Sequence, residues 1–98
     1  MRRDEALAVL RGLEQELRAQ GLAHLYIFGS VARDEATASS DVDMAFDLIP
    51  GAKFDAFDHG RIHMDLADAL GSPVDLIERQ MISSRLAQDI EGDLLQVF

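Results

Sequence analysis

The sequence contains no cysteine and no tryptophan, and it has only one tyrosine and two prolines among 98 residues. Without cysteine the chain forms no disulfide and no thiolate metal site, which fits the cytoplasm, where we expect the protein to act. Long hydrophobic runs are also missing, since the apolar 48% of the chain is spread over stretches far shorter than the roughly 20 residues of a membrane helix. The N-terminal MRRDEALAVLRGLEQELR is charged throughout, unlike a secretory signal. We therefore expect no membrane association.

Basic residues are scarce as well. Nine Lys and Arg stand against 18 Asp and Glu, giving a formal charge of -9. Such a surface repels free nucleic acid, so we expect no direct nucleic-acid binding. A basic protein partner or bound divalent cations would relieve the repulsion, although many domains are acidic without any such role. The length predicts one domain over residues 1–98, without a separate substrate domain.

Apolar periodicity and turn residues predict the order α-β-α-β-α-β-α, an α+β fold with a small mixed sheet covered by helices. Leucines at three- and four-residue steps before Gly21 predict one helix over residues 4–20. The remaining expected elements are strands at 25–28, 42–48 and 73–77, a short helix within 31–36, and helices at about 54–70 and 81–90. Phe54 and Phe57 are expected in the core. The tail DLLQVF is compatible with a strand or with another helical turn.

Asp41 and Asp43 lie two residues apart at the start of the second expected strand. Side chains with that spacing point to the same face of a sheet, where two carboxylates repel each other unless a cation lies between them. Magnesium accepts a few carboxylate oxygens together with water and substrate phosphates. The alternative is an ordinary solvated strand end.

Gly29 and Ser30 follow the buried strand LYIF directly. Glycine lets a backbone approach a ligand closely, and a helix that begins at Ser30 would present free amide groups to an anion. Taken alone, Gly-Ser is also common in ordinary turns. Together with the two aspartates, the pair predicts the two halves of a metal-nucleotide site.

Asp75 lies within PVDLI, an apolar run where a buried strand would carry a hydrophobic residue. If this third strand neighbours the second, Asp75 completes a cluster of three carboxylates. A carboxylate in that place can bind the metal and accept the proton of an attacking hydroxyl. Asp47 shares the strand face of Asp43 but lies further along it, outside the expected metal site.

The stretch GSVARDEATASSDVDMAFDL followed by SPVDLIER resembles the minimal nucleotidyltransferases of the DNA polymerase β superfamily. Their pattern is Gly-Ser, ten residues, Asp-x-Asp, and a third Asp one helix later. The residues that match this pattern, or that the family often shares, are Gly29, Ser30, Ala32, Arg33, Ser40, Asp41, Asp43 and Asp75. The resemblance runs from about Leu25 to Ile77.

The resemblance implies an enzyme that transfers a nucleoside monophosphate, expected to be AMP from ATP, to a hydroxyl. It implies that Ser30, with Gly29 and Ser40, holds the nucleotide, and that Asp41, Asp43 and Asp75 bind two magnesium ions. Asp75 would also activate the acceptor, and Arg33 would neutralise phosphate charge. Small proteins of this kind pair with HEPN-domain toxins, so the implied role is an antitoxin that adds AMP to a toxin tyrosine within a hetero-oligomer.

Other functions stay open at this stage. One alternative is a non-catalytic antitoxin that neutralises its partner by forming a complex, and another is transfer to a small molecule. One departure from the family pattern is Asp34, where glycine is frequent, because an added charge could weaken phosphate binding unless it points to solvent. His59, His63 and Asp55 have spacings that suit a metal, but we favour the interpretation that they are surface groups of a helix whose other face packs on the sheet.

Overall fold

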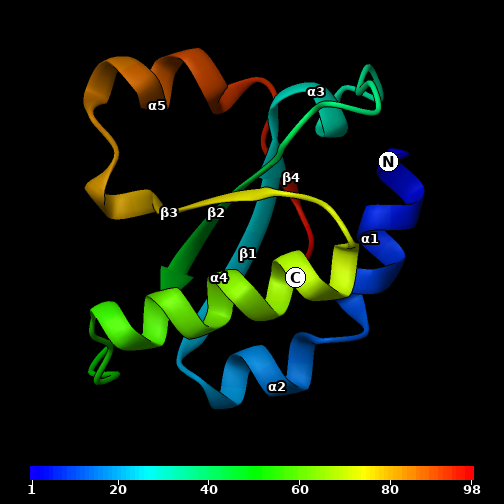
Figure 1. The fold of residues 1–98 in the computed structure, drawn as a ribbon. Coiled ribbons are helices and arrows are strands. Elements are labelled where there is room, and N and C mark those ends of the chain that lie inside the picture. The colour runs from blue at the N-terminus through cyan, green and yellow to red at the C-terminus, as the bar shows by residue number, and fades with distance from the viewer.

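A four-stranded mixed sheet with strand order β3-β2-β1-β4 lies at the centre of the computed structural model, which describes residues 1–98 (Figure 1). β1 pairs with both β2 and β4 in antiparallel fashion, whereas β2 and β3 run parallel. The strands are β1 Leu22–Phe28, β2 Val42–Leu48, β3 Val74–Glu78 and β4 Leu95–Gln96. The C-terminal tail, for which the sequence allowed a strand or a helical turn, thus contains a short edge strand. The predicted α+β class with a mixed sheet is confirmed.

Two helices precede β1, and the others lie in the connections between the strands. They are α1 Arg3–Arg11, α2 Glu14–Ala19, α3 Gly29–Ala32, α4 Ala56–Leu70 and α5 Ser84–Glu91, with a 3-10 turn, η1, at Arg79–Met81. Because parallel strands need a long crossover, α4 carries the chain from β2 back to the start of β3. None of the helices is long and apolar enough to cross a bilayer.

The prediction of a single helix over residues 4–20 is wrong. The chain leaves the helix at Gly12 and Leu13 and starts again at Glu14, so that α1 and α2 are separate. Glycine is a poor helix former because it has more backbone freedom to lose than other residues. The regular spacing of leucines continues through the break, which is why the periodicity alone did not reveal it.

The main core lies between one face of the sheet and helices α1, α2 and α4 (Figure 1), and it contains Leu10, Leu25, Met44, Phe46 and Ile62. The opposite face is covered only in part, where Ile90 of α5 packs with Phe28 and Ala45. β2 is therefore buried on both faces over most of its length. The alternation of apolar and polar residues along this strand had suggested burial of one face alone.

Phe57 is not a core residue, contrary to the expectation from the sequence. Its side chain is 86% exposed, whereas Phe54 packs against Phe46 with ring centroids 5.4 Å apart. Ile62 faces the sheet from α4, and five residues at 100° each place Phe57 about 140° away from it around the helix.

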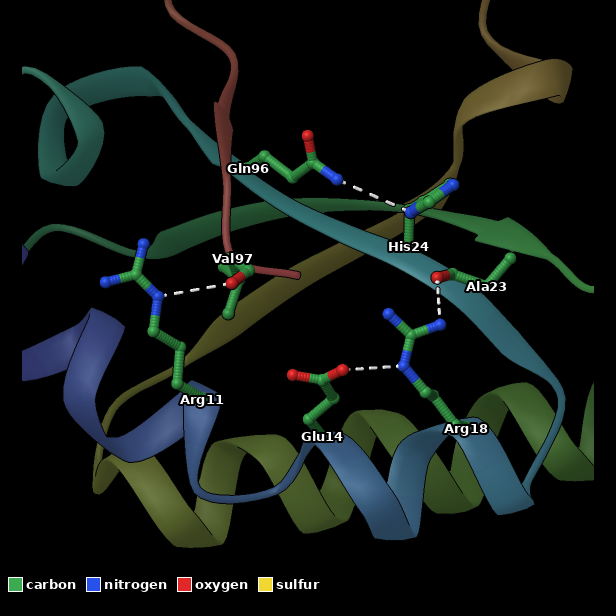
Figure 2. Close-up of polar contacts among 7 residues, drawn as sticks. All are labelled: Arg11, Glu14, Arg18, Ala23, His24, Gln96 and Val97. Atoms are coloured by element: carbon green, nitrogen blue, oxygen red, sulfur yellow. Dashed lines mark hydrogen bonds and ion pairs between the residues drawn. The ribbon is translucent and has the colours of Figure 1, made fainter.

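Polar side chains tie α1 to the chain just after β4 and α2 to β1, as Figure 2 shows. Arg11 of α1 donates to the Val97 carbonyl at 3.2 Å. Arg18 of α2 bonds Glu14 at 2.7 Å and the Ala23 carbonyl at 2.8 Å, and its guanidinium carbon lies 4.9 Å from the centre of the Phe98 ring. These contacts hold α1 and α2 against the C-terminal residues and the start of β1.

Asp47 is the one buried charged residue, with only 7% of its surface exposed. Its two carboxylate oxygens accept from Nε and Nη2 of Arg79, both at 2.8 Å, and the Tyr26 hydroxyl lies 3.3 Å away. The hydrogen bonds to Asp47 raise the pKa of Arg79, which stays charged. This ion pair fastens η1, and with it the start of α5, to β2.

Replacing Arg79 with methionine should lower the free energy of unfolding by about 2 kcal/mol, because the buried Asp47 carboxylate loses its partner. Arg85→Met, an exposed position on α5, is the matched control and should change stability by less than about 0.5 kcal/mol. Urea unfolding followed by circular dichroism measures both. Equal effects of the two substitutions would show that the Asp47–Arg79 pair does not stabilise the fold.

Candidate active site

Two of the three predicted aspartates lie side by side. Asp43 on β2 is the register partner of Asp75 on β3, and on its other side Asp43 is the partner of Phe28, the last residue of β1. Partners in neighbouring strands point to the same face, about 4.8 Å apart across the sheet. Asp41 is exposed and lies two residues before Asp43, just outside β2. All three belong to the end of the sheet where β1 stops and α3 begins.

Gly29 is packed directly against the Asp43 carboxylate. Its φ of +73° is in the left-handed region, and a Cβ added here would collide with Oδ2 of Asp43 and lie 3.3 Å from its Cγ. Glycine is thus required twice, for the backbone angle and for the space. Ser30 follows in the single turn of α3, so two of the four predicted nucleotide-binding residues begin the helix whose first residue contacts Asp43.

The site concentrates negative charge. Partial burial, followed by the charges of Asp75 and Asp41, raises the pKa of Asp43, and the Arg33 guanidinium opposes that rise only weakly. An ionised carboxylate with this surrounding is destabilised in the folded state, and a bound cation would reverse the effect.

Magnesium fits these residues without a complete cage of protein ligands. As the side chains stand, no three Asp, Glu or His residues converge as a metal-binding group anywhere in the chain. Magnesium is usually held by one or two carboxylates, with water and substrate phosphates as the remaining ligands. The adjacent Asp43 and Asp75, with Asp41 beside them, supply this kind of incomplete donor set.

The two other predicted nucleotide-binding residues lie in the segment between Ser30 and β2. Arg33 pairs with Asp93 at 2.6 Å and with Glu35 at 3.1 Å, so its charge is already shared with two carboxylates. Ser40 accepts a hydrogen bond from the Thr37 amide at 2.9 Å and thereby shapes the loop before Asp41.

Asp34 points away from the aspartates. Its φ of +60° lies in the left-handed region that favours glycine, and Asp is one of the few other residues that tolerate this region. Its carboxylate accepts a hydrogen bond from the Arg3 amide at 3.1 Å, at the start of α1. Asp34 therefore serves as a helix cap supplied from a distant part of the chain, and its charge is directed to α1.

His59 and His63 do not form a metal site. Their Nε2 atoms lie 2.9 Å from the Leu76 carbonyl and 2.7 Å from the Val74 carbonyl, respectively. A carbonyl only accepts, so both nitrogens donate to the outer edge of β3. Asp55, the third suggested ligand, is the N-cap of α4 in a capping box with Asp58.

Sequence reasoning missed the Asp47–Arg79 pair with Tyr26. Alternation along β2 placed Asp47 on the face of Asp43, and four residues of strand put it about 13 Å away. No local signal links Arg79 to it, because the partners are 32 residues apart.

The chain matches the sequence model of the "Polymerase beta, Nucleotidyltransferase" family over residues 13–96. Comparison with curated proteins found no match. A candidate minimal nucleotidyltransferase of known structure is 30% identical, with 97% of this chain and 95% of that chain covered and a TM-score of 0.76.

Two further similar structures are toxin–antitoxin complexes. One contains AMP-PNP, with 27% identity, coverage of 88% of this chain and 69% of that chain, and a TM-score of 0.72. The other is a tri-AMPylated Shewanella oneidensis HEPN toxin with its MNT antitoxin, with 23% identity, coverage of 98% and 71%, and a TM-score of 0.68, which shows the shared fold.

Fold and family together define a nucleotidyltransferase. The chain belongs to the polymerase beta nucleotidyltransferase family, and its similarity over nearly the full length of a small relative places it among the minimal nucleotidyltransferases. The resemblance drawn from the Gly-Ser and Asp-x-Asp spacing is confirmed.

Asp43→Asn should stabilise the protein at pH 7 without divalent cations, because it removes a repelled carboxylate. The raised pKa of Asp43 means that this gain is absent below the ordinary Asp pKa of about 4 and grows as the pH rises through the raised value. For a partly screened group we expect a melting temperature about 3 °C higher, which is roughly half a kcal/mol.

Thermal unfolding between pH 3.5 and 8, with and without magnesium, measures this effect. Magnesium should raise the melting temperature of the wild type more than that of the variant. Asp68→Asn, on the exposed side of α4, controls for net charge. An Asp43→Asn protein that is less stable at pH 7, or that gains as much from magnesium as the wild type, contradicts the assignment.

Gly29→Ala should cost more stability than Gly51→Ala, although both glycines have positive φ, +73° and +82°. An added Cβ at Gly51 meets nothing within 4 Å, whereas at Gly29 it meets the Asp43 carboxylate. We expect a loss of about 1 kcal/mol for Gly51→Ala and about 2 to 3 kcal/mol for Gly29→Ala. Only Gly29→Ala should also remove the stabilisation by magnesium. Identical losses in the two variants would mean that the Gly29–Asp43 contact is unimportant.

Proposed function

We propose that the protein transfers AMP from ATP to a hydroxyl in a magnesium-dependent reaction, and that the acceptor is a tyrosine of a HEPN-type toxin. The observation that carries the proposal is the register of β2 and β3, which puts Asp75 beside Asp43 while Gly29 packs on the Asp43 carboxylate. The protein would then act as the antitoxin of the pair.

The chain's own residues have distinct tasks in this reaction. Asp41, Asp43 and Asp75 would hold magnesium, which when bound neutralises charge on the triphosphate. Gly29 and Ser30 would place backbone amides and a hydroxyl against the phosphates, with Ser40 holding the adjoining loop. Arg33 reduces the negative charge near Asp43.

Asp75 suits the role of proton acceptor because it is exposed near one edge of the sheet, where an acceptor can approach. In the transfer, the acceptor oxygen forms a bond to the α-phosphorus of ATP and the bond from that phosphorus to the leaving pyrophosphate breaks. The hydroxyl proton passes to Asp75.

Two similar structures support the acceptor class. One relative is a toxin–antitoxin complex crystallised with AMP-PNP, and another contains an AMPylated HEPN toxin in complex with its antitoxin. The charge of -9 also suits a basic protein partner, since opposite charges favour association.

The test is incubation with labelled ATP, magnesium and the product of the adjacent gene, followed by mass mapping of the label. Replacing both Asp41 and Asp43 with asparagine should lower transfer at least about 100-fold while the fold is kept. Replacing Asp65 and Asp68, two exposed acids of α4, removes the same charge and should leave transfer unchanged.

Label on a partner hydroxyl that is lost only in the Asp41/Asp43 variant supports the transferase. A tight complex without label would instead favour the non-catalytic antitoxin, which neutralises its partner by binding. Label on small hydroxyl compounds and not on the protein would reassign the acceptor.

A further inference from the structure

A groove of about 460 Å³ runs along β3 and is lined by that strand, η1, α5 and His59 of α4. Its apolar lining consists of Leu76, Ile77, Met81, Ile82 and Leu86. A groove of this size accommodates one or two side chains of a bound protein.

Several apolar side chains of this groove are exposed to solvent. The Met81 side chain is 79% exposed and Leu86 is 40% exposed, although α5 and η1 pack on the sheet through Ile90 and Arg79. Exposed apolar groups gathered at one groove mark an interaction site more often than single exposed residues do.

The groove begins next to the candidate active site along β3, because its first lining residue on the strand directly follows Asp75. Leu76 follows Asp75 directly on β3, and Ile77 lies on the same face as Asp75, two residues or about 6.6 Å further along the strand. A side chain bound in the groove would therefore belong to a segment that also reaches Asp75.

The other exposed apolar surface has no such connection. Phe57 and Met64 flank a second hollow on the outer side of α4. That helix packs on the sheet face opposite to Asp43, through Ile62 and Leu66. An acceptor bound to the outer side of α4 would lie across the sheet from the aspartates.

The acidic residues at the groove indicate what kind of protein segment would bind there. Glu78 lines the groove and Asp75 lies beside its near end, so basic residues that flank an apolar anchor would be attracted. A second copy of this chain carries the same charge of -9 and would be repelled.

We propose that this groove docks the acceptor protein by taking an apolar side chain that lies close to the modified hydroxyl and has basic neighbours. The inference rests on the proposed transfer to a protein, and it assigns substrate recognition to β3, η1 and α5. The groove then binds the acceptor and the aspartates act on it.

Met81→Glu tests the proposal, with Met64→Glu as the matched control, since Met64 is likewise exposed, at 68%. Binding and transfer are both measured with the product of the adjacent gene: its dissociation constant without nucleotide, and the KM and kcat for labelled transfer. Met81→Glu should raise both the dissociation constant and KM at least tenfold and leave kcat and ATP binding within twofold. Met81→Leu should restore the wild-type values, and Met64→Glu should change none of them.

Binding and transfer separate the two hypotheses. If the wild type transfers no label but Met81→Glu still weakens the complex, the proposed reaction fails and the docking surface stands. If Met81→Glu binds and transfers like the wild type, the groove proposal is overturned. It is equally overturned if Met64→Glu is the variant that weakens binding, because the partner then docks on α4.

Discussion

The parallel pairing of β2 with β3 is the constraint on which the site depends. It sets Asp75 opposite Asp43, and a slip of one residue would turn Asp75 to the opposite face of the sheet. β3 is an edge strand of five residues, so its register needs support from outside the sheet. His59 and His63 give that support by donating to the Leu76 and Val74 carbonyls. The histidines that suggested a metal site from their spacing instead hold the strand that carries Asp75.

One face of the sheet carries the main apolar core, and the other face carries the candidate active site. One face is closed by α1, α2 and α4 over a large apolar core, whereas the other is closed only in part, for example where α5 packs on Phe28 and Ala45. The open remainder leaves room for a repelled pair of carboxylates, at a cost that the raised pKa of Asp43 records. The Asp47–Arg79 pair closes the same face further along β2. It keeps η1 and α5 in place beside the site.

Local chemistry made the strands and the site predictable. Gly29, Ser30, Asp41 and Asp43 lie within one short stretch, and a charge within an apolar run singled out Asp75. What could not be predicted depends on contacts between distant residues. The leucine spacing continues across Gly12 and hides the break between α1 and α2. Nothing near Arg79 in the sequence points to Asp47, and nothing near Asp34 shows that its carboxylate caps α1.

A single docked protein would cover both the exposed aspartates and the apolar groove along β3. Asp41 and Asp75 are both exposed to solvent, where water screens their attraction for a cation and competes with an acceptor hydroxyl. A protein that docks along β3 would cover Met81 and Leu86 and would also remove water from the aspartates next to the groove. Burial of the apolar side chains would then supply binding free energy while the loss of water strengthens the electrostatic interactions of the nucleotide and metal. On this view the acceptor is both the substrate and the missing wall of the proposed active site, which would explain why the three aspartates lie on an open face of the sheet.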